Sequence, residues 1–94
     1  MAKVDLGPLP IPETRQQDLE RAAAHLPDGC RVQAIRIARS PMFELWVEVH
    51  GVRAVRVFPL DDTAAAVSAL EELGERLQPR EAVGPVQEWA RARR

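Results

Sequence analysis

Residues 42–49, MFELWVEV, alternate without interruption between two kinds of side chain. Successive side chains of a β-strand point to opposite sides, so this period of two predicts a strand with one buried face. The two sets are Phe43, Leu45, Val47 and Val49 on the apolar side, and Glu44, Trp46 and Glu48 on the other. The first set is expected to face the core, and the second set forms the opposite, polar face.

Two neighbouring segments also predict strands. Residues 31–39 are rich in β-branched and small side chains, and residues 52–58 follow a short turn at His50-Gly51. Ser40-Pro41 separates the first of these segments from residues 42–49. Short connections join antiparallel strands, so a three-stranded meander is expected.

The length of the turn decides which residues face each other. A two-residue turn at His50-Gly51 would pair Leu45 with Arg56 and bury a guanidinium, which is costly without a partner. We therefore expect a three-residue turn over 49–51, which pairs Leu45 with Val55. A similar loop over 40–42 pairs Ile37 with Leu45. The buried face then holds Ile35, Ile37, Phe43, Leu45, Val47, Val55 and Val57, and the other face holds Arg36, Glu44, Trp46, Glu48 and Arg56.

Helices are expected before and after this meander along the chain. Residues 13–26 and 61–78 place apolar side chains at a period near 3.6, and Gly84-Pro85 precedes a short last helix. The apolar stripes are Leu19, Ala22, Ala23 and Leu26 in the first helix, and Ala66, Val67, Leu70, Leu73 and Leu77 in the second. The predicted fold is α+β: helix, three-stranded antiparallel β-meander, helix and short C-terminal helix, with the helices on one face of the sheet.

The chain of 94 residues suits one domain, expected over 13–94. Three prolines between Leu6 and Pro12 predict that residues 1–12 form an extended N-terminal arm. The arm either is a floppy terminus or packs on this or another chain.

Composition sets broad limits on location and partners. The net charge is −1, and no apolar run approaches the roughly 20 residues that cross a bilayer. Cys30 is the single cysteine, which excludes an intramolecular disulfide and a cysteine cluster for zinc. We expect a cytoplasmic protein without a cofactor. Charge is unevenly spread, since residues 30–58 carry five arginines and two glutamates, whereas residues 60–83 carry six carboxylates and two arginines.

Catalytic and metal-binding motifs are not found. The sequence has no HExxH, GxSxG, P-loop or GxGxxG pattern. Cys30 is expected to be a small buried thiol, because nothing identifies a base for it. Asp61 or Asp62 is expected to cap a helix, with metal binding as the alternative. The chain is therefore predicted not to be an enzyme.

Trp46 is the most informative candidate for binding. It is predicted on the polar face beside Arg36 and Arg56, and Trp and Arg are enriched in protein interfaces. Alternatively, the N-terminal arm or the last helix covers Trp46. Trp89, near Arg91, Arg93 and Arg94, is a second aromatic candidate. The predicted partner-binding residues are Arg36, Glu44, Trp46, Glu48, Arg56 and Trp89.

Residues 52–73, VRAVRVFPLDDTAAAVSALEEL, resemble the last strand and helix of Arm-type and AP2-like DNA-binding domains of tyrosine recombinases. The resemblance rests on Phe58, Pro59 and the alanine-rich start of the helix. It covers about half the chain. It implies a three-stranded sheet in the major groove with an amphipathic helix behind it.

Two functions follow from these patterns. The first is a small protein-interaction module, such as a regulator, inhibitor or accessory subunit, whose sheet face binds another protein or a second copy. The second is nucleic-acid binding through the same sheet, which the arginines favour and which Glu44 and Glu48 oppose. We prefer the first.

Overall fold

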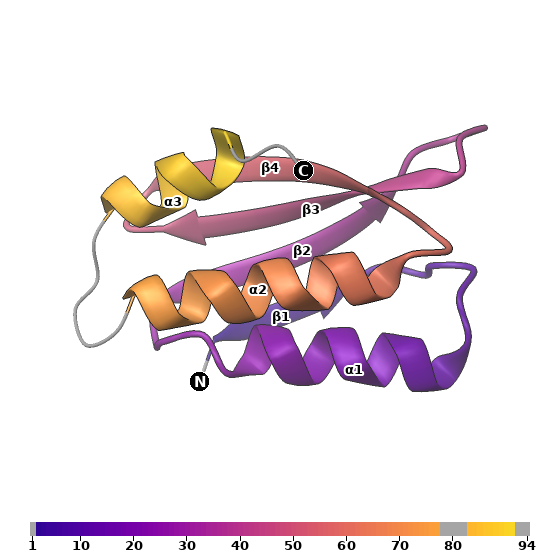
Figure 1. Cartoon of the computed structure of the whole chain (residues 1–94), viewed down its shortest axis with the longest axis horizontal. Coiled ribbons are helices and arrows are strands. Elements are labelled where there is room, and N and C mark those ends of the chain that lie inside the picture. The colour runs from indigo at the N-terminus through magenta and orange to yellow at the C-terminus, as the bar shows by residue number, and fades with distance from the viewer. Residues whose placement is uncertain (1, 78–82, 92–94) are drawn as a thin grey trace.

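The computed structural model describes residues 2–77 and 83–91. Three helices and a four-stranded mixed sheet form an α+β fold (Figure 1). The elements are β1 (Lys3–Leu6), α1 (Glu13–Ala24), β2 (Cys30–Arg36), β3 (Met42–Val49), β4 (Val52–Pro59), α2 (Thr63–Leu77) and α3 (Val83–Arg91). The predicted order of helices and meander strands is present, with one strand more.

The additional strand comes from the segment that was predicted as an arm. β1 pairs in parallel with β2, from Lys3 opposite Arg31 to Leu6 opposite Ala34. The amide of Gly7 continues the ladder by donating to the carbonyl of Ala34 at 3.1 Å. A Cβ at Gly7 would lie 3.1 Å from that same oxygen, so glycine permits the close approach. The prediction of three strands was wrong because four residues are too few to show a clear alternation.

The strands lie in the order β1-β2-β3-β4, and β2, β3 and β4 form the predicted antiparallel meander. The helices lie over one face of the sheet, with α1 and α2 side by side and α3 near β4 (Figure 1). Among the described residues, no helix combines the length and the apolar character that crossing a bilayer requires.

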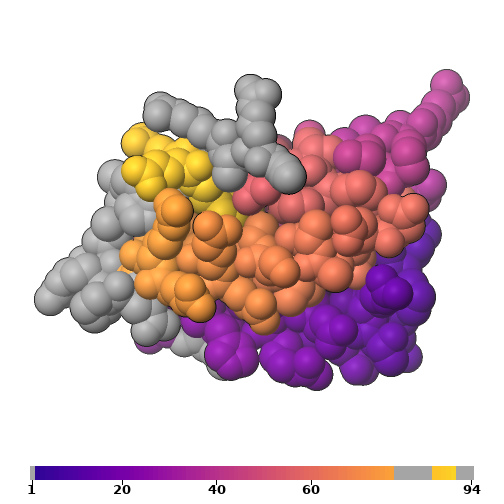
Figure 2. Space-filling model, in the orientation of Figure 1, coloured from indigo at the N-terminus to yellow at the C-terminus, as the bar shows by residue number. Residues whose placement is uncertain are grey.

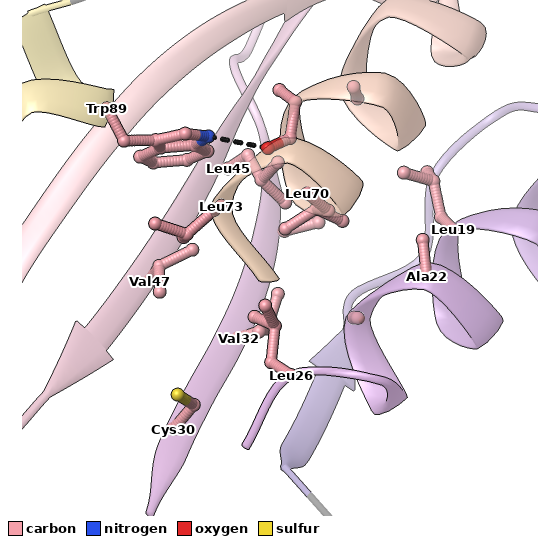
Figure 3. Close-up of a cluster of buried hydrophobic side chains, with 14 of the residues drawn as sticks. Leu19, Ala22, Leu26, Cys30, Val32, Leu45, Val47, Leu70, Leu73 and Trp89 are labelled. Carbon is pink, nitrogen blue, oxygen red and sulfur yellow. Dashed lines mark hydrogen bonds between the residues drawn. The ribbon is translucent and has the colours of Figure 1, made fainter. Parts of the chain in front are cut away.

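The core lies between the helices and this face of the sheet. Leu19, Leu45 and Leu73 come from three different elements and are fully buried together with their neighbours (Figure 3). The helix stripes predicted from periodicity are confirmed at Leu19, Ala22, Ala23, Leu26, Ala66, Leu70, Leu73 and Leu77, whereas Val67 is only half-buried.

The strand register differs from the prediction. His50 and Gly51 form a two-residue turn with φ of 51° and 81°. Positive φ at both central residues is typical of the type I′ turn, whose twist matches that of a hairpin. Leu45 consequently faces Arg56, the pairing that the sequence argument had rejected. The cost of burying Arg56 is lowered because its guanidinium carbon lies 5.0 Å from the ring centroid of Phe58 and 5.2 Å from that of Trp89.

The pairing of β2 with β3 is shifted as well. Leu45 faces Ala34 and not Ile37, because β2 ends at Arg36 and the connection to β3 spans residues 37–41. Arg39 in this connection adopts a φ of 62°. The two changes of register, of β2 and of β4 against β3, together move four side chains predicted as buried out of the core. Ile35 and Val57 are 45% and 47% exposed, and Ile37 and Val55 are half-buried.

Candidate interaction surface

The face of the sheet opposite the helices is the candidate site, and we call it the open face. Alternation along each strand assigns its side chains. They are Lys3 and Asp5 of β1, Arg31, Gln33 and Ile35 of β2, Met42, Glu44, Trp46 and Glu48 of β3, and Arg53, Val55, Val57 and Pro59 of β4. All three helices pack on the other side (Figure 1). The open face therefore lacks a covering layer of secondary structure within the described residues.

Apolar side chains occupy the middle of the open face. Ile35 and Val57 lie on either side of Glu44 in one cross-strand row. They are the two large hydrophobic side chains that are exposed in the described part of the chain. Trp46 and Val55 face each other in the adjacent row and are half-buried. Neighbouring apolar side chains on an uncovered sheet are typical of a binding surface.

Trp46 is held by its neighbours on the open face. Its indole Nε1–H donates a hydrogen bond to Oε1 of Glu44 at 3.0 Å. The guanidinium carbon of Arg53 lies 5.2 Å from the indole centroid, and an Nη of Arg53 lies 3.8 Å from Oε1 of Glu48. Among the described residues, neither the N-terminal segment nor the last helix is observed to cover Trp46. The half-buried indole is packed by Glu44 and Arg53. These contacts fix the orientation of the ring on the open face.

Charges of both signs are mixed on the open face, and they cancel. One row runs across the sheet through Lys3, Arg31, Glu48 and Arg53. Asp5 and Glu44 add two carboxylates, so three cationic side chains are matched by three anionic ones. The open face carries no net charge, although the three meander strands together are basic.

The remaining predicted binding residues do not lie on the open face. Arg36 and Arg56 alternate with the open-face residues and therefore project on the helix side. Trp89 is 3% exposed, and its Nε1–H donates to the carbonyl of Ala69 at 2.9 Å (Figure 3). The placement of Arg36 and Arg56 beside Trp46 was wrong, and Trp89 is a core residue. Of the basic residues predicted near Trp89, Arg93 and Arg94 lie outside the described residues.

Sequence reasoning missed Arg31, Ile35, Arg53, Val55 and Val57 as members of this surface. The signal that could have placed Arg53, Val55 and Val57 is His50-Gly51, whereas the positions of Arg31 and Ile35 depend on the connection 37–41 between β2 and β3. Glycine at the second position of a two-residue loop is typical of a type I′ turn, and that turn alone determines the register of β3 with β4.

The other predicted sites have structural roles. Oδ1 of Asp62 accepts a hydrogen bond from the amide of Ala65 at 3.3 Å, which confirms the predicted capping of α2. Cys30 is 4% exposed, and burial raises the pKa of its thiol above the usual value. No group of three or more His, Cys, Asp or Glu side chains within the described residues could hold a metal ion.

A groove of about 1110 Å³ separates α1 from α2 on the helix side, the side that Figure 2 shows. Its floor includes Ala22, Leu26 and Leu70, and its rims carry both Arg21 and Glu71. No described buried side-chain nitrogen or oxygen lacks a hydrogen-bond partner. The groove therefore contains no unpartnered buried polar side-chain atom among the described residues.

No protein-family model matches this chain, and no curated protein and no solved structure matches it significantly.

Proposed function

We propose that this protein is a small, non-enzymatic interaction module that binds another protein chain through its open face. The observation that carries the proposal is the row formed by Ile35, Glu44 and Val57, in which both apolar side chains are nearly half exposed. Transfer of such side chains from water into an interface stabilises a complex in proportion to the apolar area removed. Trp46, in the next row, supplies an aromatic anchor of the kind that dominates interface energies.

The state of Cys30 supports a non-enzymatic role. A nucleophilic cysteine requires a thiolate, and burial of Cys30 raises the pKa of its thiol. The nearby strand residues that face the core with it are apolar, including Val32 and Val49. These apolar neighbours offer no group that could take the proton of the thiol.

Charge on the open face favours a protein partner over nucleic acid. The arginines that made the strands basic are divided between the two faces, since Arg31 and Arg53 lie on the open face while Arg36 and Arg56 lie on the helix side. Affinity for a phosphate backbone comes from several cations that act together and release counterions. A surface whose charges cancel lacks that contribution.

Affinity capture with a single-residue variant tests the proposal. Tagged wild-type protein should retain a partner chain, and Ile35→Glu should lose it, because a buried carboxylate without a counter-charge is costly. Gln17→Glu is the matched control, since it adds the same charge at an exposed position on α1. Binding should then be repeated with the purified partner by calorimetry. Equal retention by Ile35→Glu and Gln17→Glu would contradict the proposal.

Mobility-shift titrations examine the nucleic-acid function directly. Duplex DNA, single-stranded DNA and RNA should show no shift at low salt, where electrostatic binding is strongest. A salt-sensitive shift that Arg31→Glu abolishes would replace the proposed function with the alternative.

A further inference from the structure

We infer that the chain which covers the open face is a second copy of this protein, packed face to face in a two-fold symmetric dimer. The inference rests on the proposed function and names its partner. Three features support it: the pattern of charges on the open face, the register of the β3–β4 hairpin, and the arginines and proline at the free edge of β4.

The charge pattern favours a partner whose charges also alternate. Arg31, Glu48 and Arg53 lie side by side on β2, β3 and β4. A uniformly acidic or basic partner would meet repulsion at every second strand of this row. In a copy of the same row that is displaced by one strand, Arg53 of each copy lies opposite Glu48 of the other. The open face is thus electrostatically complementary to itself.

The hairpin register supplies a symmetry axis that produces this displacement. A two-fold axis that runs between β3 and β4 and parallel to them places β3 of one copy over β4 of the other. Each cross-strand pair of the hairpin is then repeated between the copies: Glu48 meets Arg53, Trp46 meets Val55, and Met42 meets Pro59. The same residues contact each other reciprocally, as an isologous interface requires. Sheets packed in this way lie about 10 Å apart, a distance that side chains of this size fill.

The exposed apolar residues also find contacts in this arrangement. Val57 lies over the side chain of Glu44 from the second copy, whose carboxylate already accepts a hydrogen bond from Trp46. Ile35 lies one strand further out, beside the β4 edge of the other copy. Val57 thereby enters the interface, and Ile35 lies at its border.

Edge-to-edge pairing of two β4 strands is the main alternative for self-association. The amide of Leu60 donates to the carbonyl of Pro41, so even-numbered residues of β4 direct their backbone groups toward β3. The outward groups belong to odd-numbered residues, among which Pro59 has no N–H. β4 carries two arginines and no carboxylate. Like charges on adjoining strands and a proline both oppose pairing of two β4 edges. The structure therefore favours association through the open faces.

Light scattering coupled to size exclusion tests the dimer with two charge variants. Wild-type protein should be a dimer. Arg53→Glu makes both interface positions acidic and Glu48→Arg makes both basic, so each variant alone should be monomeric, with a dissociation constant raised about 100-fold or more. An equimolar mixture of the two variants should recover a dimer that contains one copy of each. Gln17→Glu on α1 should remain dimeric, and circular dichroism should show that all variants are folded.

Several outcomes would overturn the inference. A wild-type chain that stays monomeric up to about 1 mM, the weak limit of specific association, rules the dimer out. A dimer that survives Trp46→Glu would show packing away from the open face, because Trp46 lies on the interior strand β3 and meets Val55 of the second copy in the proposed arrangement. A mixture of the charge variants that remains monomeric would reject the proposed axis. If the wild type is monomeric but Ile35→Glu still loses a different captured protein, the proposed function stands and only the identity of the partner fails.

Discussion

Arg56 of β4 lies over the buried ring of Trp89 of α3, with its guanidinium carbon 5.2 Å from the ring centroid. The indole of Trp89 in turn donates to the carbonyl of Ala69 in α2. One tryptophan therefore joins the last helix to both the sheet and the second helix. The arginine that charge arguments had assigned to the outer surface takes part in this contact between layers.

Trp89→Ala should lower the free energy of unfolding by about 3–5 kcal/mol, the range for truncation of a buried aromatic side chain. Urea denaturation followed by circular dichroism measures the change. Trp89→Phe keeps a ring beneath Arg56 but removes the hydrogen bond to Ala69, and should be the milder substitution. If both variants unfold at the wild-type midpoint, Trp89 does not hold α3 in place.

Leu45→Ala should lower the free energy of unfolding by about 2–5 kcal/mol, because Leu45 is fully buried in the center of the sheet. Trp46→Ala removes a larger side chain from the neighbouring position but should cost less, since Trp46 is half-buried on the open face. Thermal melts of the two variants provide the comparison, carried out at a concentration where the chain is monomeric. A lower melting temperature for Trp46→Ala would contradict the assignment of faces.

Gly51→Ala should destabilise the hairpin by about 1 kcal/mol, because residues other than glycine pay for a φ of 81°. A Cβ at this position would meet no atom within 4 Å, so the cost is conformational and not steric. His50→Asn is the companion variant, since asparagine tolerates positive φ better and should leave stability equal or higher. Denaturant midpoints distinguish the two. A neutral Gly51→Ala would argue against the two-residue turn.

We expect the buried thiol of Cys30 to make the folded protein less stable in alkaline solution. Burial raises the pKa of its thiol in the folded chain above the usual 9.0, so the folded state holds this proton more tightly than the unfolded state. The stabilising contribution of the protonated thiol is complete at pH values below the pKa of Cys30 in the unfolded chain. It declines as the pH rises from there through the pKa of Cys30 in the folded chain. The free energy of unfolding should therefore fall above about pH 9, and the part due to Cys30 should vanish in Cys30→Ala. Equal pH profiles for the two proteins would show that the thiol is not desolvated.

Cys30→Ser should leave partner binding intact, because the thiol is buried on the helix side of the sheet and away from the open face. The capture experiment described for Ile35→Glu provides the measurement. Loss of binding in a Cys30→Ser protein that melts like the wild type would assign the thiol a functional role.

Local patterns in the sequence determined the elements. Alternation over residues 42–49 placed Phe43, Leu45 and Val47 in the core, and the helical stripes of α1 and α2 were confirmed almost residue by residue. Periods of two and 3.6 are properties of single segments, and burial of one face follows from them wherever the segment lies. Glu44, Trp46 and Glu48 were correctly grouped on one surface for the same reason.

The tertiary structure decided how the segments face one another. The register depends on the loop between two strands, and a shift of one residue moves a whole strand to the opposite face. Burial of Arg56 on an apolar face is costly, but Phe58 and Trp89 supply aromatic surfaces for its guanidinium. Trp89 lies 33 positions further along the chain. Segment 3–6 became a strand only because β2 offered a free edge. The pairing of β1 with β2 and the contact of Arg56 with Trp89 join segments that are distant in the sequence, so the open face as a whole, with Ile35 exposed on it, emerged only when the chain was folded.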